Sequence, residues 1–95
     1  MPQKLRESDI QKRLAAAPGW TIEHGELTRS FELASFPAAL MFVSAVGFLA
    51  EAAEHHPDIL IKYRKVTLSL VTHDAGGLTE KDFVLAGQIN ALPKG

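Results

Sequence analysis

The stretch EAAEHHPDI, residues 51–59, places two adjacent histidines between carboxylates and a proline. Histidine changes charge near neutral pH, so it can serve as a general acid or a general base. If a helix continues to the pair, Glu51 and His55 lie four residues apart on one face, where the carboxylate can fix the imidazole tautomer. Alternatively, the histidines only favour the negative end of a helix dipole, and Pro57 ends that helix. The motif alone leaves both interpretations open.

A further histidine, His73, ends an alternating strand pattern and precedes the turn sequence DAGG. It shares a face with Thr67 and Ser69, the less apolar face of that strand, so we predict that it lies outside the core. Loops at strand ends often carry functional side chains. The alternative is a solvated loop histidine without a role.

Zinc is an alternative use of these residues, because its catalytic sites employ imidazole and carboxylate ligands. The spacing argues against it, since the chain has no HxxxH pair on one helical face and no HExxH motif. A cysteine nucleophile is excluded by composition, and no serine stands in a GxSxG elbow. We therefore expect no metal site and no nucleophilic catalysis.

The length and composition predict one small domain that must position these histidines. Ninety-five residues, 46% of them hydrophobic, suffice for a single compact domain over residues 1–95. The 10 basic and 11 acidic residues nearly balance and are scattered, so we expect no direct binding to nucleic acid. The lack of cysteine suits a reducing compartment, and the N-terminus has no apolar signal core, so we expect a cytoplasmic protein.

The first third of the chain predicts a helix followed by a β-hairpin. Ser8 and Gln11 have the spacing of a helix capping box, and a Pro-Gly pair stops this helix before Trp20. From there the apolar pattern changes to period two, with a turn at Gly25 between two strands.

Residues 33–50 form an uncharged run long enough to pass a first screen for a membrane span. Ser35 and Pro37 start a helix inside that run, leaving about 22 Å of apolar helix against a hydrocarbon core of about 30 Å. We therefore predict a buried helix that runs from a Ser35 cap to Pro57, and no membrane span. Because this helix is apolar nearly all round, we also predict self-association. We expect Phe42→Glu or Val46→Glu to yield smaller oligomers or insoluble protein.

The last third of the chain predicts two more strands and a final helix. The strands flank a charged turn at residues 64–65, and Thr79 with Asp82 has capping-box spacing. The resulting order, α-β-β-α-β-β-α, predicts an α+β fold in which three helices pack on one face of a four-stranded antiparallel sheet.

Several motifs together resemble the pterin-4a-carbinolamine dehydratases, a family also known in animals as dimerisation cofactors of a homeodomain transcription factor. They are ExxxHHP, KVTLSLVTH and GGLTEKD, preceded by the Gly-Trp pair at residues 19–20. The resemblance covers most of the chain, and its specificity lies in the order and spacing of the motifs. It implies dimers joined through sheet edges and tetramers joined through the long helix. Ile59 departs from the pattern, because relatives commonly have an aromatic residue there.

The resemblance implies the dehydration of 4a-hydroxytetrahydropterin to quinonoid dihydropterin, the recycling step that follows aromatic amino-acid hydroxylases. No cofactor or metal takes part in it. The C4a hydroxyl leaves as water while N5 loses a proton, so one group donates a proton and another accepts one. The alternative is a non-catalytic dimerisation module that bridges a protein partner, as in the animal cofactor role.

The resemblance also assigns catalytic roles to residues of this chain. His55 and His73 are the acid and the base, in an order that the sequence leaves open. Glu51 orients or charges the site, and His56 contacts or positions the pterin.

A second set of residues is predicted to contact the pterin. Trp20 matches an aromatic residue of the family's pocket, although it equally fits the core of the hairpin. Asp82 matches an acidic residue near the site, although its capping-box position also explains it. Main-chain groups at a strand end can pair with the pterin edge as a neighbouring strand would. The residues predicted to do so are Glu54, Val71, Thr72 and Asp74.

Overall fold

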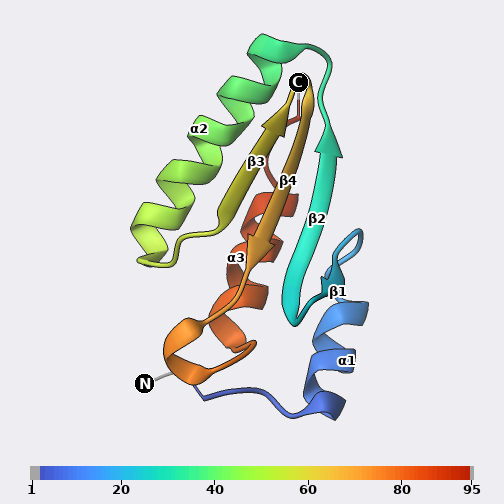
Figure 1. Ribbon diagram of the computed structural model, residues 1–95, viewed down its shortest axis with the longest axis vertical. Coiled ribbons are helices and arrows are strands. Elements are labelled where there is room, and N and C mark those ends of the chain that lie inside the picture. Colours follow the sequence, from blue (N-terminus) through green and yellow to red (C-terminus); the bar gives the residue numbers. More distant parts are fainter. Residues whose placement is uncertain (1–2, 95) are drawn as a thin grey trace.

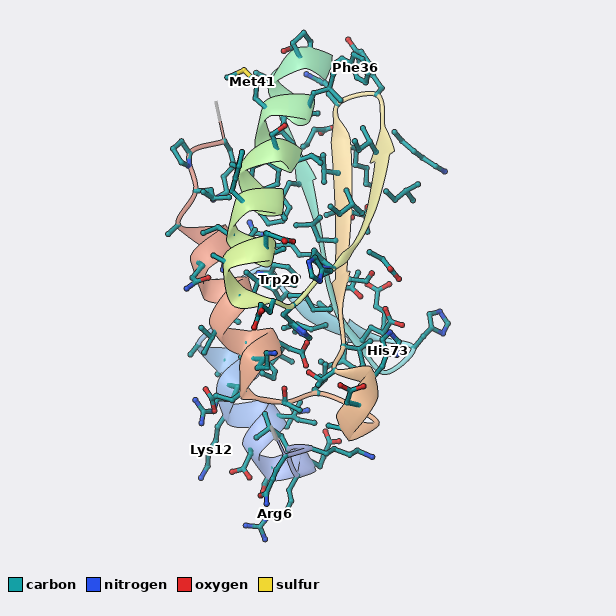
Figure 2. All side chains as sticks on the ribbon, turned by 90° about the vertical axis from the view of Figure 1, so that its left-hand side faces the viewer. Arg6, Lys12, Trp20, Phe36, Met41 and His73 are labelled. Atoms are coloured by element: carbon teal, nitrogen blue, oxygen red, sulfur yellow. The ribbon has the colours of Figure 1, made fainter. Side chains whose placement is uncertain are left out.

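A four-stranded antiparallel sheet in the order β1-β2-β4-β3 is the centre of the computed structural model, which describes residues 3–94 (Figure 1). The strands are β1 (Thr21–Glu23), β2 (Glu26–Glu32), β3 (Asp58–Lys62) and β4 (Lys65–Leu70). The helices are α1 (Glu7–Ala15), α2 (Phe36–Ala53) and α3 (Glu80–Asn90), and a short 3-10 helix, η1 (His73–Ala75), precedes α3. The predicted α+β class and element order are confirmed, and Figure 2 shows α2 and α3 on the same side of the strands.

The core lies between the sheet and the helices and follows from the two periodicities of the sequence. Alternate residues of β2 and β4 point toward the helices, and the register pairs Leu27 with Leu70 and Phe31 with Val66. The buried residues of α2 recur every three to four positions, as one face of a helix requires: they are Ala39, Phe42, Val46 and Ala50. The other sheet face carries hydroxyl groups, including those of Ser30 and Thr67, 2.8 Å apart.

The start of α2 confirms the prediction, whereas its end corrects it. The Oγ of Ser35 accepts a hydrogen bond from the N–H of Ala38 at 3.2 Å, which caps the helix. The helix stops at Ala53 because Glu54 adopts a left-handed conformation with φ of 51°. The N–H of His55 then bonds to the carbonyl of Ala50 at 3.0 Å and closes the helix end. Both histidines of the pair therefore lie beyond the helix.

The capping boxes predicted for the two other helices differ in outcome. α1 begins at Glu7, one residue before the expected Ser8 cap, and has no side-chain cap. Instead, the amide of Gln11 donates to the carboxylate of Glu7 within the helix at 3.0 Å. At α3 the capping box of Thr79 and Asp82 is present as predicted.

The outward face of α2 leaves apolar side chains uncovered in the single chain. Within the described residues, α2 is the one helix long and apolar enough to meet the composition test for a membrane span, but its other face packs on the sheet. Phe42 and Val46 belong to that packed face, so of the two outcomes expected for their substitution by glutamate, insoluble protein is the one that their burial explains. The exposed positions are Phe36, Leu40, Met41 and Phe48, two of which are labelled in Figure 2.

Candidate active site

A cleft of about 480 Å³ lies between the segment that follows α2 and the segment that follows β4. This volume falls in the range of pockets for small organic ligands. Figure 2 shows His73, just after β4, well away from Phe36 and Met41 at the start of α2. The lining residues are Glu54, His55, His56, Val71, Thr72, His73, Asp74 and Lys81. The three histidines singled out in the sequence therefore line one cleft.

His55 is held by Asp82, which is 27 residues away in the sequence. Nε2 of His55 lies 2.5 Å from Oδ1 of Asp82, and the two residues are 8% and 0% exposed. An ionised carboxylate only accepts hydrogen bonds, so Nε2 carries the proton of the neutral imidazole. Nδ1 of His55 has no hydrogen bond to any described residue. Among the described residues, every buried side-chain nitrogen has a hydrogen-bond partner, so Nδ1 is not a buried atom. Nδ1 is therefore accessible and free to exchange a proton.

The carboxylate of Asp82 is fixed by two further donors. Its second oxygen, Oδ2, accepts hydrogen bonds from the hydroxyl of Thr72 and from the N–H of Thr79, both at 2.9 Å. The second of these bonds belongs to the capping box of α3. The capping role predicted for Asp82 is confirmed, and the same carboxylate contacts His55, although Asp82 itself does not line the cleft.

Glu51 contacts His56 instead of the expected His55. Its Oε1 lies 2.9 Å from Nε2 of His56, and both side chains are largely exposed. The predicted pairing of Glu51 with His55 required the helix to continue through the histidines, and it is wrong because the chain leaves the helix at Glu54. Glu51 does not line the cleft but lies on the outer surface of α2 near Phe48.

His73 is the first residue of η1, and its side chain is exposed at the cleft. No hydrogen bond from its ring to another residue of the 3–94 segment restrains it. Across the same segment, no group of three or more histidine or acidic side chains is arranged to hold a metal ion. Acid/base chemistry is what these side chains can supply.

Trp20 is a core residue and does not line the cleft, so of the two places that the sequence left open for it the structure has the core. It is buried, and its Nε1 donates a hydrogen bond to Oδ1 of Asn90 at 2.8 Å. Its ring meets Phe31 edge-on, with centroids 6.1 Å apart. The large apolar surface of the indole explains this burial, because its single polar group finds a partner on α3.

The sequence and the fold were compared with those of known proteins. The sequence profile described as pterin 4 alpha carbinolamine dehydratase matches residues 3–92. The chain belongs to this family. A relative from Chloroflexus aurantiacus is 57% identical over 89 residues, which cover 94% of this chain and 96% of that protein. One from Roseiflexus sp. is 56% identical over 92 residues, covering 97% and 99%. Both relatives are named provisionally as pterin-4-alpha-carbinolamine dehydratases.

One solved structure agrees with this family assignment, and a second shares the fold. A crystal structure described as a transcriptional coactivator/pterin dehydratase from Brucella melitensis superposes with a TM-score of 0.90 at 34% identity, covering 94% of this chain and 97% of that one. A pterin dehydratase-like protein, identified as a RuBisCO assembly factor in the alpha-carboxysome, matches at 22% identity with a TM-score of 0.62. That second likeness concerns the fold alone.

One residue of the cleft in this dehydratase family member was not predicted from the sequence. Lys81 lines the cleft from the first turn of α3, directly before Asp82. The sequence signal that could have identified Lys81 is its position next to Asp82. Both residues lie in the first turn of α3 and therefore at the same end of the domain.

Proposed function

We propose that this chain dehydrates 4a-hydroxytetrahydropterin to quinonoid dihydropterin and water during tetrahydrobiopterin recycling. The observation that carries the proposal is the cleft in which His55, oriented by the buried Asp82, lies with His56 and His73. Membership of the family supplies the pterin substrate class. The two together favour an enzyme that works with side-chain acid/base groups.

The reaction requires two proton transfers whose charges balance. The C4a–O bond breaks, and the departing hydroxyl takes a proton to leave as water. N5 loses its proton, and the electron pair of that N–H bond forms the C4a=N5 double bond. One histidine donates and the other accepts, so the pair must exchange protons with solvent before the next turnover. Both His55 and His73 line the open cleft, which permits that exchange.

We propose that His55 exchanges its proton through Nδ1, because Asp82 occupies Nε2. His73 acts from the start of η1 as the other member of the pair, in either order. His56, oriented by Glu51, positions the pterin. The pterin edge would pair with main-chain groups of the cleft wall that Glu54, Val71 and Asp74 supply. Thr72 was also expected to do so, but its N–H and its carbonyl are already bonded to residues 75–77 of the same loop.

Stopped-flow mixing with freshly generated 4a-carbinolamine tests this proposal. The purified wild-type protein should accelerate dehydration over buffer, whereas His55→Ala and His73→Ala should each lose about a hundredfold or more of that rate. His24→Asn is the matched control, because His24 lies in the exposed β1–β2 turn with φ of 54°, which asparagine tolerates. A wild-type protein without any acceleration would remove the enzyme from consideration.

We also propose that the chain forms homodimers or homotetramers through surfaces that include the outward face of α2. The exposed apolar side chains of that face, above all Phe48 at 80% exposure, support this. The same face is the feature that favours the second candidate function, a module that bridges another protein. Sedimentation of the pure wild-type protein at micromolar concentration distinguishes these two uses of the face. Dimers or tetramers are expected if the face mediates self-association, and a monomer is expected if it binds a different protein.

A further inference from the structure

The hydroxyl of Thr72 belongs to a buried hydrogen-bond network in which the donor and the acceptor of each bond can be assigned. Thr72 has a single hydroxyl proton, which goes to Oδ2 of Asp82, an acceptor only. The hydroxyl of Thr79, 2.8 Å away, must therefore donate to the oxygen of Thr72. Oγ1 of Thr79 in turn accepts the N–H of Lys81 at 3.3 Å. This arrangement leaves the carboxylate one orientation, in which Oδ1 faces His55.

The main chain of Thr72 closes the loop that carries His73. Its N–H donates to the carbonyl of Gly77 at 3.1 Å. Its carbonyl accepts from the N–H groups of Ala75 and Gly76, both at 3.1 Å. Gly76 completes this tight loop with φ of 77°, a left-handed conformation that suits glycine. The same residue is thus bonded to the loop of one histidine and to the carboxylate that orients the other.

We propose that Thr72 is a positioning residue whose hydroxyl fixes the orientation of Asp82. Through Asp82 it fixes the tautomer of His55, while its main chain fixes the loop that carries His73. Removal of the hydroxyl at constant shape leaves Oδ2 of Asp82 with the N–H of Thr79 as its one remaining donor. It also leaves the Thr79 hydroxyl without its acceptor. The carboxylate can then turn away from Nε2 of His55, and once Nε2 loses this acceptor His55 is no longer restricted to one tautomer.

Three variants test the kinetic consequence, which rests on the proposed function. Thr72→Val should lower kcat about ten- to hundredfold, as expected when a charged group loses a hydrogen bond, while KM changes little because the main chain stays in place. Thr72→Ser retains the hydroxyl and should restore most of the rate. Thr28→Val is the matched control: Thr28 is 9% exposed against 6% for Thr72, and its hydroxyl bonds to Glu26 and Ser69 outside the cleft. A kcat for Thr72→Val equal to that of Thr28→Val would overturn the proposal.

The imidazole nitrogen chemical shifts of His55 provide a measurement that needs no turnover. In the wild type and in Thr28→Val they should report one tautomer with the proton on Nε2, and in Thr72→Val a mixture of tautomers. Unchanged shifts in Thr72→Val overturn the proposal whatever the activity. Mixed shifts in a protein whose wild type does not dehydrate the carbinolamine uphold the positioning role and reject the proposed function instead. If Thr72→Val does not fold, Thr72→Cys against Thr72→Ser makes the same comparison with a weaker donor.

Discussion

Replacing Asp82 by asparagine preserves the shape of the buried side chain but changes its hydrogen-bonding capacity. The carboxylate accepts three hydrogen bonds, from Nε2 of His55, the hydroxyl of Thr72 and the N–H of Thr79. An asparagine offers one oxygen and a donating NH₂ group. If the oxygen serves Thr72 and Thr79, the NH₂ group faces His55 and forces its proton onto Nδ1. If the oxygen serves His55, the main-chain donor of Thr79 meets another donor.

The first arrangement preserves the cap of α3 and should therefore dominate. His55 then presents N–H to the cleft in its neutral form, so it cannot accept a proton there, and this neutral N–H is also a far weaker acid than an imidazolium. In either role the variant should lose the roughly 10²–10⁴-fold that a general acid/base group contributes. Loss of the charged hydrogen bonds should destabilise the fold by about 2 kcal/mol. That loss corresponds to a fall in Tm of about 8–16 °C for a domain of this size.

Stopped-flow dehydration and thermal unfolding, each measured on Asp82→Asn and on Asp58→Asn, check these values. Asp58 is an exposed aspartate at the start of β3, so its substitution should change neither rate nor Tm appreciably. Turnover by Asp82→Asn within a few-fold of wild type would refute the reasoning, because the orientation of His55 would then not matter to the reaction.

Three further predictions concern the core, the assembly and the pH dependence. Trp20→Phe should lose about 1–2 kcal/mol of unfolding free energy with its bond to Asn90, and turnover should be unchanged; denaturant titration and the kinetic assay check this, and a selective loss of turnover would contradict the core assignment. Phe48→Glu should yield smaller oligomers that remain folded, as checked by sedimentation and circular dichroism, and an unaltered sedimentation coefficient would exclude this residue from the interface. Burial and the neighbouring Arg29 lower the pKa of Lys94 below its usual 10.5, so the folded state binds fewer protons than the unfolded state. The unfolding free energy of the wild type relative to Lys94→Gln should therefore rise as the pH increases toward 10.5, and an opposite trend in denaturant titrations would show that the sign is wrong.

The residues that line the cleft illustrate how far local sequence patterns predict this protein. Ser35 and Thr79 cap their helices as expected, because a cap depends on groups within three residues of it. The strand periodicity placed His73 at a strand end and outside the core, where it is found. The resemblance to the dehydratases contributed Asp82, which composition and spacing explain only as a cap. These features depend on neighbours along the chain, and so the sequence contains them.

The sequence by itself determined the α+β order of elements, the helix-facing side of the sheet and the three histidines that line the cleft. Only the tertiary structure decided that His55 pairs with Asp82 and Glu51 with His56, since the left-handed turn at Glu54 takes the chain out of α2 before the histidines. The physical reason is range: capping and periodicity are set by hydrogen bonds and side-chain directions within a few residues. The contact between a loop and a helix 27 residues further along exists only once α2 and α3 have packed against the same sheet.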